Sequence, residues 1–289
     1  LYRTQRRGGR GKVGMGTKEE DFVSMLFIAS MHTYVLFFSD QGKVYWLKVH
    51  ELPEAGRASK GRAIVNLLSL SPGEEIASIL PVREFTEGKF VMTATALGVI
   101  KKTDLMEYSR PRAGGIIAMG LNEGDRLIAT ALTMGQDEVS LSTRQGMSIR
   151  FHEEDVRPMG RAAVGVRGID LEKGDVAVGM EILKAQGTLL SVTEHGYGKR
   201  TAVEEYRSQS RGGKGVIALK VTEKTGRVVG VSQVVETDEV MLVTDGGKII
   251  RLGMGDLRVI GRNTQGVRLI GLAEKERVVS IARLAEKEE

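Results

Sequence analysis

The sequence predicts an all-β protein built as a closed ring of repeats, and three observations support this prediction. A glycine followed by a β-forming run returns six times, at intervals of 50, 54, 50, 50 and 51 residues. Apolar positions inside the repeats follow a period of two, with Val240 and Leu242 on one face of a strand and Met241 and Val243 on the other. Helical periodicity is not sustained for three turns anywhere. A period near 50 is typical of propeller-like arrays, in which each repeat forms one small sheet that packs against its neighbours.

The repeats are marked by anchor glycines that precede the β-forming runs. The six anchor glycines are Gly11, Gly61, Gly115, Gly165, Gly215 and Gly266. We expect a single domain over residues 1–289, because a closed repeat array can hold this length as one unit. The expected repeats cover approximately residues 5–56, 57–110, 111–160, 161–210, 211–261 and 262–289.

Each full repeat also carries a hairpin whose second strand ends in a lysine or an arginine. The expected hairpins span residues 35–48, 91–102, 139–150, 189–200 and 240–251, with turn glycines Gly42, Gly98, Gly146, Gly196 and Gly247. Glycine supplies the positive φ that tight hairpin turns require. Together with the anchored runs, this pattern predicts about four strands per repeat, and closure of the ring hides most sheet edges.

The sixth repeat is short. After Gly266 the chain has room for one strand pair, with residues 277–282 as the second strand, and it ends in Glu-Lys-Glu-Glu. The first residue is Leu1 rather than methionine. We therefore expect a fragment whose sixth blade is incomplete and whose upstream residues would supply the missing strands.

Composition narrows the classes of partner. The chain has no cysteine, which fits a reducing cytoplasm and removes disulfides, thiolate metal sites and thiol nucleophiles. Lysine and arginine exceed aspartate and glutamate by 42 to 37, a net charge of +5 that favours polyanionic partners. Aromatic residues make up only 5%, which argues against single-strand binding by base stacking. No apolar run is long enough to span a bilayer, so we expect no membrane partner.

Lysines and arginines recur beside the same turn or inter-repeat loop in successive repeats, and this placement predicts one basic rim. The predicted rim residues are Lys12, Arg57, Lys60, Arg62, Lys101, Lys102, Arg110, Arg112, Arg161, Lys199, Arg200, Arg211, Lys214 and Arg262, accompanied by Arg157, Arg207 and Arg258.

The most basic heptapeptide is residues 5–11 (QRRGGRG). Taken alone, it could be a charged, solvated N-terminal tail. Its frame returns as residues 209–215 (QSRGGKG) and more weakly as residues 57–61, so we interpret it as an element of the repeat. Its glycines allow phosphates to approach the backbone closely, and its arginines offer donors that match phosphate geometry.

Catalytic motifs are not apparent. Residues 9–14 match G-x-G-x-x-G, but a dinucleotide site needs a strand before this motif and a helix after it. We find no nucleophile with a positioned base and no carboxylate cluster suited to Mg²⁺. The four histidines fall at unrelated places in the period. We therefore predict no catalytic residues and no metal site.

Residues 5–11 closely resemble the seven-residue box that marks the C-terminal domain of DNA gyrase A, with Arg10 where lysine is usual. Further similarity lies in residues 62–68 (RAIVNLL), 196–201 (GYGKRT) and 259–267 (VIGRNTQGV). The resemblance implies a six-bladed β-pinwheel, a propeller-like disc of about four strands per blade whose blades exchange strands. It also implies that duplex DNA wraps around the basic rim, which would then be a DNA-binding rim.

The same resemblance assigns functional residues and partners. The DNA-binding box would be Gln5, Arg6, Arg7, Gly8, Gly9, Arg10 and Gly11. The implied partners are duplex DNA, the rest of gyrase A and gyrase B in a heterotetramer, in the bacterial cytoplasm at the nucleoid. The cleaving tyrosine would lie in the preceding part of gyrase A, and ATP and Mg²⁺ elsewhere in the holoenzyme, so this chain would hold no cofactor.

Two alternatives remain open. The C-terminal domain of the corresponding topoisomerase IV protein usually has fewer blades and a degraded box, so six anchors and an intact box argue against it. A propeller used as a protein-interaction scaffold, similar to the chromosome-condensation regulators, would need no basic rim. Binding of duplex DNA discriminates between the scaffold and the wrapping domain.

Overall fold

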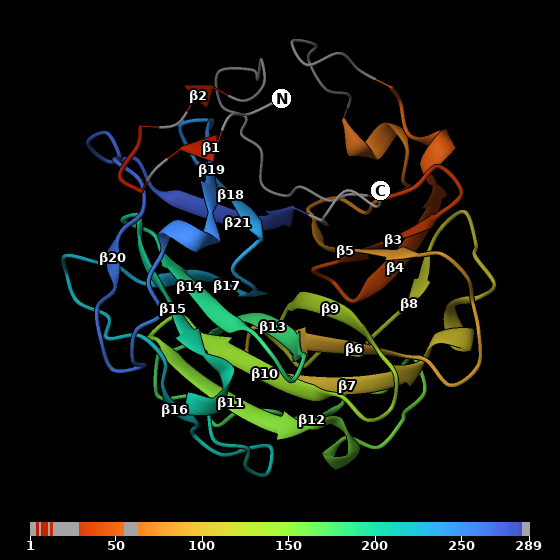
Figure 1. The fold of residues 1–289 in the computed structure, drawn as a ribbon. Coiled ribbons are helices and arrows are strands. Elements are labelled where there is room, and N and C mark those ends of the chain that lie inside the picture. The colour runs from red at the N-terminus through yellow and green to blue at the C-terminus, as the bar shows by residue number, and fades with distance from the viewer. Residues whose placement is uncertain (1–3, 6, 11, 14–28, 55–62, 285–289) are drawn as a thin grey trace.

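The computed structural model describes residues 4–5, 7–10, 12–13, 29–54 and 63–284. Its strands form five sheets, which are the blades of a ring (Figure 1). The helices of the described residues are short 3₁₀ turns: η1 (Val49–Glu51), η2 (Ile64–Asn66), η3 (Leu105–Tyr108), η4 (Glu153–Asp155), η5 (Val203–Glu205) and η6 (Met254–Asp256). None of these helices is long and apolar enough to cross a membrane.

The blades share one strand order, written here from the inner strand to the outer one. Blade 1 contains β5 (Ile76–Val82), β3 (Tyr34–Ser39), β4 (Lys43–Lys48) and β8 (Ile116–Ile117). Blade 2 contains β9 (Leu127–Thr133), β6 (Phe90–Thr95), β7 (Val99–Asp104) and β12 (Val166–Arg167). Blade 3 contains β13 (Ala177–Leu183), β10 (Glu138–Thr143), β11 (Met147–His152) and β16 (Val216–Ile217).

Blades 4 and 5 continue this plan. Blade 4 contains β17 (Val228–Val234), β14 (Thr188–Thr193), β15 (Tyr197–Ala202) and β20 (Val267–Arg268). Blade 5 contains β21 (Val278–Leu284), β18 (Glu239–Thr244) and β19 (Lys248–Gly253), with β1 (Thr4–Gln5) and β2 (Lys12–Val13) both paired to β19. The predicted all-β class and the five hairpins are confirmed, because each hairpin forms the middle pair of one sheet.

In blades 1 to 4 the outer strand comes from the second repeat after the one that supplies the hairpin, which is the strand exchange expected of a pinwheel. It begins directly after an anchor glycine, at a place where the backbone approaches the preceding blade closely. Gly215 has φ of +77°, and a Cβ on it would lie 2.3 Å from the carbonyl oxygen of Ser148 on β11. Gly165 has φ of +102°, and its Cβ would lie 2.5 Å from the oxygen of Ile100 on β7. The anchors are therefore glycines for both conformational and steric reasons.

The predicted number of six blades is wrong, because the described residues form five. An anchor glycine marks a junction between two sheets and not the start of a new one. The short stretch after Gly266 supplies β20 to blade 4 and β21 to blade 5, and β1 and β2 complete blade 5, so no incomplete sixth blade begins there. Gly61 lies outside the described residues, and the first described element after it is the 3₁₀ turn η2.

The hydrophobic core lies within the blades and between neighbouring ones. The inner strands of consecutive blades contact one another, from β5 through β9, β13 and β17 to β21. Aromatic residues fill the outer part of one joint, where the rings of Phe38 in blade 1 and Tyr108 after blade 2 meet edge to face at 5.9 Å. This packing fixes each blade relative to the next and so positions the loops that connect them.

Candidate nucleic-acid interface

The loops that lead from one blade back to the preceding one form the outer part of the ring. These crossing loops are residues 109–115, 156–165, 206–215 and 257–266, and each ends at an anchor glycine. Three of them run parallel to the third strand of the preceding blade, through the bridges Lys102–Pro158, Arg150–Ser208 and Arg200–Val259. The repeating geometry places equivalent loop residues at equivalent positions around the ring.

Exposed arginines occupy one such position. Arg157, Arg207 and Arg258 lie in consecutive crossing loops, each directly after a buried residue that follows the 3₁₀ turn, and all three are exposed. Arg110 and Arg112 are exposed in the shorter loop before Gly115. The structure therefore brings these predicted bases together along one surface of successive blades.

A second set of predicted rim residues joins the blades. Arg161, Arg211 and Arg262 are half-buried, and each donates from Nη1 to a main-chain carbonyl at the end of the exchanged strand one blade back. The acceptors are Ile117, Arg167 and Ile217, at 3.2, 3.0 and 2.7 Å. These arginines are therefore fixed in place, with part of each side chain still accessible.

Lys101 and Lys199 are buried and do not belong to the exposed rim, which corrects their prediction. Lys101 Nζ donates to the carbonyls of Ala118 and Arg161, both at 2.6 Å. Lys199 Nζ donates to the carbonyl of Gly261 at 2.7 Å and also to that of Arg262. Burial lowers the pKa of each lysine to about 8, assisted by the positive charge of a nearby arginine. Both lysines therefore fix crossing loops in place through hydrogen bonds to main-chain carbonyls.

Lys102 and Arg200 are also buried, and their prediction as DNA-binding residues is corrected in the same way. Lys102 Nζ lies 3.5 Å from the carboxylate of the fully buried Glu153, and Arg200 Nε donates to the carbonyl of Leu257 at 2.8 Å. Trp46 is the equivalent residue in blade 1, and its Nε1 donates to the carbonyl of Tyr108 at 2.9 Å. The position thus needs a long side chain with an N–H donor that reaches the next blade. It does not require exposure or even positive charge.

The box loop, residues 5–11, lies against blade 5 and against the segment that follows β20. Gln5 pairs with Leu252 in blade 5, the amide of Gly8 donates to the carbonyl of Leu269 at 2.6 Å, and the amide of Gly271 donates to that of Gly9 at 2.9 Å. These bonds fix the loop by its backbone, so its side chains are available for other contacts.

Arg7 and Arg10 are exposed, and neither has a hydrogen bond or ion pair to any other described residue. Arg6 and Gly11 lie outside the described residues, as do Arg57, Lys60 and Arg62 and the side chain of Lys12.

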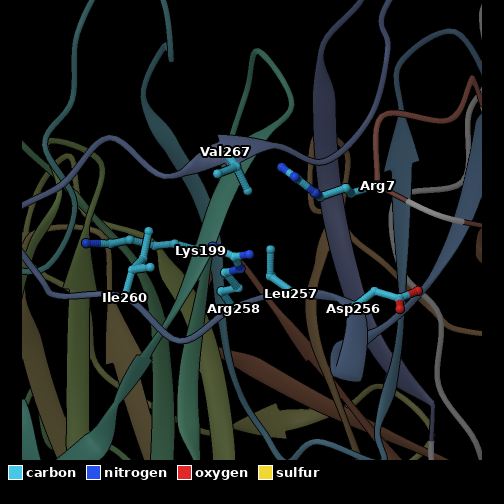
Figure 2. Close-up of a pocket in the computed structure, with 7 residues that line it drawn as sticks. All are labelled: Arg7, Lys199, Asp256, Leu257, Arg258, Ile260 and Val267. Atoms are coloured by element: carbon cyan, nitrogen blue, oxygen red, sulfur yellow. The ribbon is translucent and has the colours of Figure 1, made fainter.

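Two hollows flank the box loop. The first, of about 330 Å³, lies between Arg7 and the crossing loop at Asp256 to Ile260, and Figure 2 shows Arg7 pointing across it towards Val267. The second, of about 510 Å³, is lined by Arg10, Lys248 and Arg268 together with backbone at Gly8 and Gly271. Guanidinium donors beside glycine backbone suit phosphate oxygens, whereas Lys248 Nζ is paired with the carboxylate of Glu276 at 2.7 Å.

The sequence analysis missed Arg268 and Lys248 as members of this site. A signal for Arg268 was available, because in the four two-residue strands β8, β12, β16 and β20 the second residue after the anchor glycine is the exposed one. Burial is half-buried then exposed in β8, β12, β16 and β20 alike. Lys248 carried no such signal, because it reads as an ordinary residue after a hairpin turn. Within the described ranges, no three histidine, aspartate or glutamate side chains are grouped as a metal site would require.

Comparison with known proteins relates this architecture to one family. A family model described as DNA gyrase C-terminal domain, beta-propeller, matches residues 1–30, 33–83, 89–134, 137–184, 187–234 and 238–285. DNA gyrase A of Salmonella typhimurium is 52% identical over 285 residues, which are 99% of this chain and 32% of that protein. DNA gyrase A of Escherichia coli K12 is 50% identical, over 99% of this chain and 33% of that protein. The chain thus spans about a third of the length of these relatives.

Solved structures agree with the sequence comparison. The structure of a DNA gyrase A C-terminal domain matches with a TM-score of 0.89 at 27% identity, covering 98% of this chain and 93% of that one. The C-terminal domain of a DNA topoisomerase IV matches with a TM-score of 0.78 at 26% identity, covering 88% of this chain and 80% of that one.

Proposed function

The chain belongs to the DNA gyrase C-terminal domain family, and from this premise we propose that it binds duplex DNA without regard to base sequence and wraps it around the outer surface of the ring. Within a gyrase holoenzyme this wrapping would enable ATP-dependent negative supercoiling. The observation that carries the proposal is the recurrence of an exposed arginine at one position of consecutive crossing loops, at Arg157, Arg207 and Arg258.

Such spacing suits a polymer with charges on its outside. A duplex that follows the ring presents phosphates to each crossing loop in turn, and contacts to phosphates carry no sequence information. Smooth bending of DNA, whose persistence length is about 50 nm, costs on the order of several kcal/mol per short segment. Several blades must therefore contribute contacts, and the fixed geometry of the joints keeps those contacts on one curve.

The box would fix one end of the wrapped segment. Its loop is held by backbone bonds while Arg7 and Arg10 make no hydrogen bond or ion pair within the described residues, so both guanidinium groups are available to phosphate without breaking an internal bond. The cleaving tyrosine, the ATP site and its Mg²⁺ would belong to the rest of gyrase A and to gyrase B, with which this chain would assemble on bacterial chromosomal DNA.

The experiment that tests wrapping is topology analysis of relaxed plasmid closed by ligase in the presence of this chain. Wrapping with one handedness traps supercoils of one sign, in proportion to the amount of bound chain. A variant with Arg157, Arg207 and Arg258 replaced by glutamine should trap fewer supercoils without loss of the fold, because these side chains are exposed and make no hydrogen bond or ion pair within the described residues. Binding without any change of linking number would contradict the proposal.

A further inference from the structure

The segment at residues 209–215, here called the second box, repeats the backbone of the box. Gly8 and Gly212 have φ of +83° and +81°. The amide of Gly212 donates to the carbonyl of Gly168 at 2.7 Å, just as the Gly8 amide donates to Leu269 at 2.6 Å. The Asp170 amide donates to Gly213 at 2.9 Å, the same length as the bond between Gly271 and Gly9. By backbone geometry alone, the second box is equally suited to approach a phosphate.

The charges around the two boxes differ. Lys214 takes the place of Arg10, and its Nζ lies 2.6 Å from Oε1 of Glu172, with both side chains 65% exposed. Asp170 adds a second carboxylate, 4.0 Å from Arg167. At the box, the residues equivalent to Asp170 and Glu172 are Gly271 and Ala273, which carry no charge.

The other basic residue of the second box, Arg211, is also hydrogen-bonded within the protein. Arg211 donates from Nε to the carbonyl of Asp155 at 2.8 Å and from Nη1 to that of Arg167 at 3.0 Å. Its counterpart Arg7 has no bond of this kind among the described residues and borders the hollow shown in Figure 2. The Glu172 carboxylate raises the pKa of Lys214, first through their hydrogen bond, so the lysine is a charged but already paired group.

We propose that the second box is a latent phosphate-binding loop, kept from clamping duplex DNA by the carboxylate of Glu172 with Asp170 beside it. The inference rests on the proposed function, because it concerns where on the ring the DNA backbone is held. A phosphate that reached Lys214 would lie within a few ångströms of Glu172, and like charges at that distance repel one another. The exposed pair is weak in itself, so removing one carboxylate is enough to free the lysine. Firm clamping is then confined to the box.

The test measures binding of a fluorescently labelled linear duplex of mixed sequence to the full 289-residue chain by anisotropy, over a series of salt concentrations. Glu172→Gln is expected to raise affinity about three- to tenfold, and to steepen the salt dependence by about one phosphate contact. Glu123→Gln is the matched control, because Glu123 is exposed in the equivalent turn before the inner strand of blade 2. It is expected to change affinity by less than about twofold, since exposed charges are well screened.

A double variant distinguishes two causes of higher affinity: the release of Lys214 and the general loss of a negative charge. Lys214→Met alone is expected to change affinity by less than about twofold, because the lysine is already paired. In the Lys214→Met background, Glu172→Gln is expected to bring no gain. The proposal is overturned if the gain persists without Lys214, if Glu123→Gln matches it, or if Lys214→Met alone weakens binding as much as Arg10→Met. If the unaltered chain itself binds duplex in a salt-independent way, the proposed function fails instead.

Discussion

The Nε atom of Arg200 donates a hydrogen bond of 2.8 Å to the carbonyl oxygen of Leu257, which ties blade 4 to the crossing loop that follows blade 5. Seven positions further along the chain, Arg207 is exposed on the crossing loop that follows blade 4 itself. Two arginines that look alike in the sequence thus have separate tasks. One supports the ring, and the other faces the solvent where DNA would lie.

Substitution of these two arginines should separate stability from binding. Arg200→Met removes a buried donor and leaves the Leu257 carbonyl without its partner, so we expect the free energy of unfolding to fall by about 2–4 kcal/mol. Arg207→Met should change it by less than about 0.5 kcal/mol while weakening duplex binding. Urea denaturation and anisotropy measure the two effects. A stable Arg200→Met chain with weakened DNA binding would return Arg200 to the rim.

The close approach at Gly215 should make alanine costly there. Its φ of +77° and the 2.3 Å distance from an added Cβ to the Ser148 oxygen predict a loss of about 2–4 kcal/mol in the free energy of unfolding for Gly215→Ala. Gly174 has a similar φ of +81° with nothing within 4 Å, so Gly174→Ala should cost only about 1 kcal/mol. Equal losses in chemical denaturation would mean that conformation alone, and not contact with the preceding blade, explains the anchor.

The buried Lys101 should make the free energy of unfolding depend on pH. Its pKa is about 8 in the folded chain because it is buried, and 10.5 is the ordinary value that applies when the chain is unfolded. Between pH 8 and 10.5 the unfolded chain binds more protons, so stability rises with pH in that window. The free energy of unfolding of the unaltered chain, minus that of Lys101→Met, should increase by up to about 3 kcal/mol from pH 7.5 to 10.

The exposed Lys220 provides the control for this measurement, since Lys220→Met should leave the corresponding difference nearly constant. A difference for Lys101 that falls with pH would reverse the sign expected for a buried cation.

The box should matter beyond its charge. In full-length gyrase A assembled with gyrase B, replacing Arg6, Arg7 and Arg10 by alanine should abolish negative supercoiling while DNA cleavage and ATP-independent relaxation survive. The comparison triple at Arg110, Arg112 and Arg157 removes the same charge from exposed crossing loops and should retain some supercoiling. Gel analysis of plasmid topoisomers measures both, and identical behaviour of the two triples would reduce the box to three more positive charges.

Much of the fold can be read from the sequence because its signals are local. A glycine turn such as Gly146 between alternating strands defines a hairpin wherever it occurs, and the five hairpins followed. The number of blades could not be read in this way. The two residues after Gly215 pair with β11, so whether an anchored strand belongs to its own sheet or the previous one depends on pairing between distant segments.

The site was predictable in part for a similar reason. The box and the exposed bases at Arg110 and Arg112 follow from charge and glycine content. The burial of Lys199 does not, because a base at the end of a hairpin has the same local pattern whether it meets solvent or a carbonyl of the next blade. The position of Arg268 after its anchor glycine indicated exposure, but only the fold shows that it lies at the same hollow as Arg10.

Strand exchange sets the unit in which such a ring can grow or shrink. Removing residues 165–214 would take β12 to β15 out of three different sheets. The strand after Gly215 would then follow the crossing loop before Gly165 and could take the place of β12 on β7. The inner strand β17 could take that of β13, and β20 could pair with β11. Each sheet that had lost a strand would again have four strands. Loss or duplication of a blade is thus structurally simple from one anchor glycine to the next, whereas a cut at the edges of a single sheet would damage its neighbour.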